Sequence, residues 1–206
     1  MTYHYGVTWK RYYILFVFLL MIYLNVFWHI SISVVRETIK DKYKLNTVQE
    51  YALLILYDVL YFPGAIIAVI LHNKFSLRTC IFIAALVQSI GTLIMILSFV
   101  HYTFFYFGRA LWCIIYQTIV FATPLLVVKW FEDSKRVIMI VIWISATYLT
   151  TDHSYGLNYL IYEGIEDKSK NTETVILFFF MIKAGFCIVL SIIIFFTFPS
   201  RQKIPP

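Results

Sequence analysis

The sequence predicts an all-α membrane protein with six transmembrane helices and with both termini in the cytoplasm. Hydrophobic residues make up 61% of the 206 positions and charged residues only 14%, whereas soluble domains average about 45–50% and 25%. Long apolar runs recur along the whole chain, and its length accommodates about six spans of roughly 20 residues each. These observations leave little chain for a soluble domain.

The boundaries of the predicted spans follow from the polar segments between the apolar runs. A cytoplasmic lead over residues 1–11 ends in two basic residues, and a basic cytoplasmic tail occupies residues 200–206. The first apolar run is too long for a cleaved signal peptide, so we interpret it as a retained span. The transmembrane domain covers residues 12–199, with spans at about 12–35, 51–71, 79–100, 102–128, 137–157 and 174–199.

Charged or polar segments separate most of these spans. The first is a loop over residues 36–50, in which Asn46 or Thr47 is a candidate N-cap for the second span, with Glu50 in the first turn of that helix. Only a short join near His101 separates the third span from the fourth. Two further polar segments, at residues 129–136 and 158–173, precede the fifth and sixth spans.

The connection between the second and third spans sets the predicted orientation. Residues 72–78 form a turn so short that the two helices must lie antiparallel. Because Lys74 and Arg78 are basic, the positive-inside rule places this turn in the cytoplasm. The predicted cytoplasmic side then carries nine Lys and Arg residues and the other side six. The net charge of +6 is therefore interpreted as a membrane-face signal and not as a nucleic-acid-binding surface.

Four charged residues fall inside predicted spans, where charge is costly and usually faces the bundle interior or a water-filled cavity. They are Asp58, Arg109, Asp152 and Lys183. Asp58, Arg109 and Lys183 lie at similar depth, roughly 10–14 Å below the outer ends of their spans. Asp58 is therefore a candidate partner of Arg109 or of Lys183. The functional interpretation is a substrate or proton pathway, and the alternative is an ion pair that holds the helices in register.

Aromatic and amide side chains at membrane depth are the other candidates. Trp28 has a ring face that binds cations when it lines a cavity, and His29 lies beside it in the first span. The alternative for both is ordinary packing or contact with lipid. Gln88 and Gln117 are mid-span amides, and they either line a cavity or form interhelical hydrogen bonds.

Sequence signatures of enzymes are absent. The chain contains no G-x-S-x-G, H-E-x-x-H, P-loop or dinucleotide-binding fingerprint, and its five histidines lack the spacing of metal ligands. Its three cysteines fall inside apolar runs and suggest no disulfide framework or metal motif. We therefore expect no enzymatic activity, metal or cofactor. An intramembrane hydrolase using Asp58 and Asp152 is the least favoured alternative.

A series of short motifs runs through residues 11–136. Its members are Arg11-Tyr12-Tyr13-Ile14-Leu15, Asn25-Val26-Phe27-Trp28, Tyr57, Tyr61-Phe62-Pro63, Asn73-Lys74-Phe75-Ser76-Leu77-Arg78-Thr79, Gly108, Gln117, Pro124 and Trp130-Phe131. In order and spacing, these motifs resemble the amino-terminal half of a major facilitator superfamily transporter. The closer resemblance is to the feline leukaemia virus subgroup C receptor family, solute carrier family 49.

The resemblance implies transport of choline, ethanolamine or haem, with Trp28 in an aromatic cage for a quaternary ammonium. It also implies a gating turn, formed here by Asn73, Lys74, Ser76 and Arg78. The family has an acidic residue and a glycine where this chain has Asn73 and Ser76. The substrate-binding residues that we predict are Trp28, His29, Asp58, Arg109 and Gln117.

A chain of this length provides only half of such a transporter, because facilitators bind substrate between two six-helix halves. The expected partners are therefore the lipid bilayer, a small solute, and either a separate second half or a second copy of the chain. The alternative is a non-transporting, truncated relative that acts as a membrane interaction subunit. Both hypotheses predict a multi-pass integral membrane protein, in the plasma membrane or in an organelle.

Overall fold

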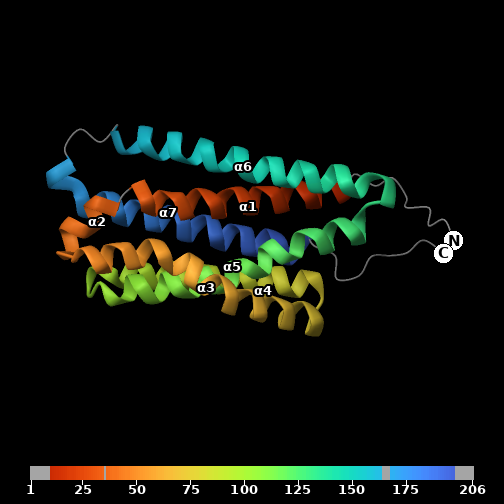
Figure 1. Cartoon of the computed structure of the whole chain (residues 1–206), viewed down its shortest axis with the longest axis horizontal. Coiled ribbons are helices and arrows are strands. Elements are labelled where there is room, and N and C mark those ends of the chain that lie inside the picture. The colour runs from red at the N-terminus through yellow and green to blue at the C-terminus, as the bar shows by residue number, and fades with distance from the viewer. Residues whose placement is uncertain (1–9, 35, 164–167, 198–206) are drawn as a thin grey trace.

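The computed structural model describes residues 10–34, 36–163 and 168–197, and the regular structure in these ranges is entirely helical. Figure 1 shows the long helices lying side by side along one axis. In chain order the elements are α1 (Lys10–Val34), α2 (Arg36–Tyr43), α3 (Thr47–Lys74), α4 (Leu77–Ile96), the 3-10 turn η1 (Leu97–Phe99), α5 (Thr103–Trp130), α6 (Asp133–Glu163) and α7 (Lys168–Thr197).

The long helices overlap the predicted spans. Four of them are long and apolar enough to cross a membrane, namely Tyr12–Val34 within α1, and α3, α4 and α5. The described part of α7 carries a shorter apolar stretch, Phe180–Phe196. The chain is therefore an integral membrane protein with an all-helical fold, while the six crossings and the cytoplasmic position of both termini stay predictions.

The polar segments are more helical than the sequence analysis predicted. Part of the loop at residues 36–50 forms the eight-residue helix α2. Helix α6 continues through Glu163, because residues 158–163 hold no glycine or proline that would end it. Helix α7 already begins at Lys168. The third predicted span ends early as an α-helix, at Ile96, and tightens into η1.

Helix α2 is fixed to the start of α3 by a buried carboxylate. Glu50 is 4% exposed, and it accepts bonds from Arg36 Nε at 2.8 Å and from Lys40 Nζ at 2.7 Å. The hydrogen bond to Glu50 also raises the pKa of Lys40 above its ordinary value. Of the two candidate N-caps, Asn46 is the one used: its side chain accepts from Gln49 N, and Gln49 Oε1 accepts from Asn46 N.

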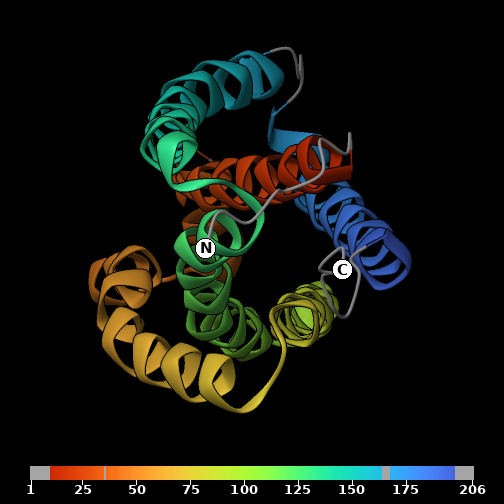
Figure 2. The same ribbon diagram turned by 90° about the vertical axis from the view of Figure 1, so that its right-hand side faces the viewer.

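Helix α5 packs at the centre of the bundle, against α3, α4, α1 and α6 (Figure 2). Small residues allow the closest approaches, as is usual between membrane helices. A Cβ added at Gly64 of α3 would stand 2.6 Å from the Ile114 carbonyl oxygen of α5. A Cβ added at Gly91 of α4 would stand 2.8 Å from the Gly108 carbonyl oxygen. These contacts hold α3 and α4 tightly against α5 and so position the side chains of its inner face.

Candidate solute-binding site

A buried basic side chain, Arg109 of α5, links three helices near the middle of the bundle. Its side chain is fully buried. The guanidinium donates from Nε to the Leu53 carbonyl oxygen of α3 at 3.2 Å, and from Nη2 to His29 Nδ1 of α1 at 3.2 Å. The adjacent Gly108 brings α4 close to this part of α5. Two of the predicted site residues, His29 and Arg109, are therefore in direct contact.

The contact with Arg109 fixes the protonation of His29. A guanidinium has donors and no acceptor, so His29 Nδ1 must accept the bond. A neutral imidazole that accepts at Nδ1 carries its hydrogen at Nε2, and His29 therefore offers an N–H donor on the far side of its ring. The ring lies 4.4 Å from the Tyr57 ring and parallel to the Trp112 ring, with 6.2 Å between the latter centroids.

Stacked aromatic rings continue this group along α5. Trp112 and Tyr116 are parallel, with centroids 5.3 Å apart, and the Tyr57 ring of α3 lies 5.9 Å from that of Tyr116. The buried Gln117 side chain faces α3, since a Cβ added at Gly64 would stand 2.9 Å from Gln117 Cγ. The predicted site residue Gln117 therefore lies at the α3–α5 contact.

A second buried cation, Lys183 of α7, completes the group. Its side chain is 1% exposed, and Nζ lies 4.6 Å from the centroid of the Trp112 ring, in a cation–π arrangement. Lys183 is also near enough to Arg109 and His29 to interact with both electrostatically. We name His29, Tyr57, Arg109, Trp112, Tyr116 and Lys183 the cation–aromatic cluster.

The carboxylate that the sequence offered as a partner for these cations lies elsewhere. Asp58 is exposed on α3, and among the described residues it forms neither of the two ion pairs considered for it, with Arg109 or with Lys183. Asp58 follows Tyr57 by one residue, and the roughly 100° turn between neighbours directs it away from the α5 contact. Asp152 of α6 is likewise exposed.

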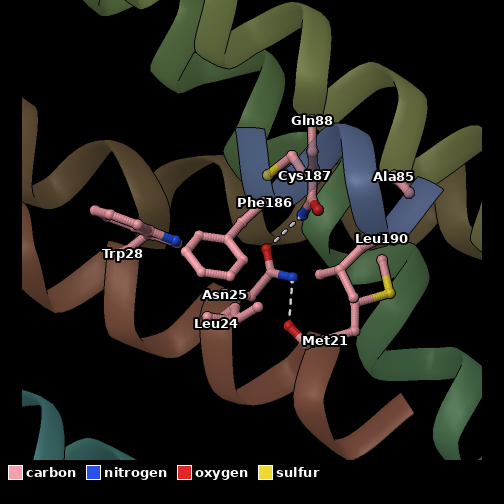
Figure 3. A pocket seen from close by; sticks show the side chains of 9 residues that line it. All are labelled: Met21, Leu24, Asn25, Trp28, Ala85, Gln88, Phe186, Cys187 and Leu190. Carbon is pink, nitrogen blue, oxygen red and sulfur yellow. Dashed lines mark hydrogen bonds between the residues drawn. The ribbon is translucent and has the colours of Figure 1, made fainter. Parts of the chain in front are cut away.

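Trp28 and Gln88 lie in a separate pocket between α1, α4 and α7 (Figure 3). Gln88 Nε2 donates to Asn25 Oδ1 at 2.7 Å, and Asn25 Nδ2 donates to the Met21 carbonyl oxygen at 2.8 Å. Gln88 therefore forms the interhelical hydrogen bond that was one of its two interpretations. The void has a volume of about 10 Å³, which is room for one water molecule. Phe186 and Cys187 of α7 complete the lining.

The predicted gating turn connects α3 and α4 through Phe75 and Ser76. Ser76 is the N-cap of α4 and accepts from Thr79 N at 3.3 Å. Arg78 donates to the Phe195 carbonyl oxygen of α7, and its guanidinium lies 5.3 Å from the Phe195 ring centroid. Asn73 and Lys74 are exposed. The turn therefore contacts α7 near its carboxyl end, at Phe195, which is 12 residues after Lys183.

Sequence reasoning missed the aromatic members of the cluster as site residues. Arg109, Trp112 and Tyr116 follow each other at intervals of three and four residues, which places them on one face of a helix. That spacing was available in the sequence, but aromatic residues are so frequent in this chain that it did not stand out. Among the described residues, no group of three His, Cys, Asp or Glu side chains is placed to hold a metal ion.

Comparison with known proteins identifies the fold class. No protein-family model matches the chain, and no curated protein sequence does. The fold nevertheless resembles part of a solved structure of a major facilitator superfamily transporter. That structure is a bacterial homolog of the human lysosomal transporter Spinster, in an inward-facing and unoccupied conformation, with a TM-score of 0.74 at 17% sequence identity.

The match covers almost the whole of this chain but only part of the other. It covers 96% of this chain and 45% of the bacterial chain, so this chain spans less than half the length of its structural neighbour. The fold is thus like that of part of this transporter, which supports the facilitator-type fold that the sequence motifs implied. At this level of identity the match establishes the fold, and the finer resemblance to solute carrier family 49 stays a prediction.

Proposed function

We propose that this chain is a half-length transporter of the major facilitator type, which forms a solute pathway together with a second six-helix unit. The observation that carries the proposal is the fold match, which accounts for nearly the whole chain and for 45% of a known transporter. In transporters built from two such halves, the substrate binds near the membrane midplane at the interface between them. A single half therefore needs a partner surface to enclose a solute.

The outward face of α3 supports this proposal. In the most apolar part of α3, only 17% of the residues are buried, which is the lowest share among the four candidate spans. Asp58 lies on this exposed side, with Val59 61% exposed and Phe62 75% exposed beside it. A carboxylate within an apolar span requires a protein partner or water. We infer that the second six-helix unit covers this face and that Asp58 lies in the space between the two.

The solute is proposed from the resemblance to solute carrier family 49. Choline, ethanolamine and haem are the candidates, and the transport would proceed without ATP hydrolysis. Trp28 is buried beside the small pocket of Figure 3 rather than open to a large cavity. An aromatic cage for choline at Trp28 therefore requires the pocket to widen, which a second half in contact with α1 and α7 would have to bring about.

The alternative function is a membrane interaction subunit without transport activity. It is favoured by Asn73 and Ser76, which replace the acidic residue and the glycine of the family's gating turn. In the structure Ser76 caps α4 and Asn73 is exposed, which are roles that any helical turn can use. This alternative predicts a stable assembly that moves no solute.

Uptake measurements distinguish the two functions. The purified chain is reconstituted in liposomes, and the uptake of radiolabelled choline, ethanolamine and haem is followed. We expect uptake of one of them, reduced at least fivefold by Asp58→Asn and unchanged by Asp41→Asn, which alters an exposed carboxylate of α2. Absence of uptake for all three solutes, by the chain alone and after co-expression with six-helix partners, would favour the interaction subunit.

A further inference from the structure

The cation–aromatic cluster presents hydrogen-bond donors without an anionic acceptor. Among the described residues, Arg109 Nη1, Lys183 Nζ and Trp112 Nε1 are buried and have no hydrogen-bond partner. His29 adds the Nε2–H that its contact with Arg109 requires. Two fully buried cations thus lie close together in the bundle, and the nearest span carboxylate, Asp58, is turned away from them.

Such an arrangement is unfavourable in the absence of a ligand. Buried charges in proteins are normally paired, and an unpaired buried donor loses its hydration without compensation. The Trp112 ring offsets part of this cost for Lys183, but it provides nothing for Arg109 Nη1. An oxyanion between Arg109 and Lys183 would compensate both cations, since guanidinium and ammonium form their strongest hydrogen bonds with carboxylate and phosphate oxygens.

We propose that the cation–aromatic cluster binds the anionic group of an organic solute, a carboxylate or a phosphate, between Arg109 and Lys183. That the bound molecule is a transported solute rests on the proposed function. That it carries a negative charge rests on the cation–aromatic cluster alone. The stacked rings of Trp112 and Tyr116 line the same region and provide apolar surface for the rest of the molecule. A solute with an anionic head and an apolar or aromatic body matches both features.

The pocket of Figure 3 is connected to the cluster through α1 and α7, and its volume of about 10 Å³ would have to grow to hold that body. Lys183 and Cys187 lie one turn apart on the buried face of α7, and Cys187 lines the pocket. His29 is adjacent in sequence to Trp28, which lines it from α1. In Figure 3 the Phe186 ring lies between Trp28 and Asn25, and this side chain is 47% exposed. Rotation of Phe186 towards the surface would enlarge this pocket, and the proposal requires such an enlargement.

The same charges oppose a quaternary ammonium. A choline-like cation near Trp28 would approach the side of the bundle that holds Arg109 and Lys183, and among the described residues no carboxylate forms an ion pair with either of these cations. The inference therefore ranks the three solutes implied by the resemblance: haem, which carries carboxylates, is favoured over choline and ethanolamine, which are cations.

Binding of matched probes tests the inference directly. Benzoate and phenyl phosphate are titrated into the purified chain at constant ionic strength, with thermal unfolding and equilibrium dialysis as readouts. Phenyltrimethylammonium is the cationic counterpart, benzyl alcohol the neutral one, and inorganic phosphate the anion without a body. We expect both aromatic anions to bind at least tenfold more tightly than the cation and the alcohol, and more tightly than inorganic phosphate.

Variants locate the site. Arg109→Gln and Lys183→Met should each weaken binding of the aromatic anions at least tenfold. Lys129→Met removes an exposed cation at the cytoplasmic end of the same helix as Arg109, and it should leave binding unchanged. Should Arg109→Gln fail to fold, Arg109→Lys keeps the charge but loses the planar fork, and we expect it to weaken binding of both aromatic anions several-fold.

Three results would overturn the inference: equal affinity for the anion and the cation, tighter binding of inorganic phosphate alone, or loss of binding in Lys129→Met as large as in Lys183→Met. The test also separates this inference from the proposed function. Binding of the aromatic anions without uptake of any solute would support the anion site and would contradict the proposed transport. Uptake of a solute without binding of the aromatic anions would support transport and would contradict the anion site at the cluster.

Discussion

The inner face of α5 and the outward face of α3 differ in the sign and in the burial of their charged side chains. In the most apolar part of α5, 61% of the residues are buried, and Arg109 lies there near Lys183 of α7 and a group of aromatic rings. Of the corresponding part of α3, 17% is buried, and it carries the exposed carboxylate Asp58. Among the described residues, Asp58 is thus separated from Arg109 and Lys183 and pairs with neither of them. The difference is the basis for proposing that each face has a partner outside the described residues.

Each face then requires something from outside the chain. Under the proposed function, a second half would cover the outward face and an anionic solute would lie beside Arg109 and Lys183. Were the charges only a means of holding helices in register, Asp58 would turn inwards and pair with one of the cations. The following changes test whether this separation of charges is real, beginning with the largest expected effect.

Substituting the close-packed glycine of α5 should have the largest effect. In Gly108→Ala the new Cβ would stand 2.8 Å from the Met95 backbone nitrogen and closer still to the Gly91 carbonyl. Because backbone atoms cannot move aside cheaply, we expect a loss of about 3 kcal/mol or more in the free energy of unfolding. Chemical denaturation in detergent micelles measures this loss.

The control lies on the outward side of α6. A Cβ added at Gly156 meets no atom within 4 Å among the described residues, so Gly156→Ala should be neutral or stabilising by up to about 1 kcal/mol. If the two substitutions had the same effect, the helices around α5 would not be packed as described, and the positions of Arg109 and Trp112 would be in question.

Removing the buried ammonium of Lys183 should change the free energy of unfolding by an intermediate amount, and it should stabilise the protein. In buffer without organic anions, Lys183→Met is expected to raise the free energy of unfolding by about 1–2 kcal/mol, because an apolar side chain replaces an unpaired buried charge. Lys129→Met, at an exposed position, should stay within about 0.5 kcal/mol of the original chain. Destabilisation by Lys183→Met would instead show that the contact with the Trp112 ring outweighs the cost of burial.

The smallest effect on stability is expected on the outward face. Asp58→Asn should change the free energy of unfolding of the solubilised chain by less than about 0.5 kcal/mol, since the side chain is exposed and forms no ion pair among the described residues. Asp41→Asn is the matched control. A loss above about 1.4 kcal/mol, which is tenfold in the unfolding equilibrium constant, would mean that Asp58 does pair with Arg109 or Lys183.

The sequence predicted the helical membrane fold because that fold follows from patterns along the chain. Apolar runs mark α1, α3, α4 and α5, and the short basic turn with its Ser76 cap makes α3 and α4 antiparallel. The order of motifs also indicated a facilitator half-bundle, and the fold match supports that architecture. The polar stretches were harder to interpret, because charged residues continue a helix as readily as they form a loop, as α2 shows.

The site was only partly predictable. His29 and Arg109 were both predicted as site residues, but nothing in the sequence indicated that they bond to each other across α1 and α5. Positions along the sequence predict only the depth of a residue in its span, and they predict a similar depth for Asp58 and Arg109. Rotation about the helix decides which face they occupy, and small differences in packing, such as the approach at Gly64, set that rotation. Partners across helices therefore could not be assigned.

The most direct test of the account is the mass of the native particle, extracted from the membrane together with its surrounding lipid and without detergent. One chain has a mass of 24.4 kDa. The account predicts a protein mass near twice that value, or one that includes a second six-helix unit, because the outward face of α3 needs a cover. A particle of one chain alone would contradict the pairing of two halves, and with it the proposed transport.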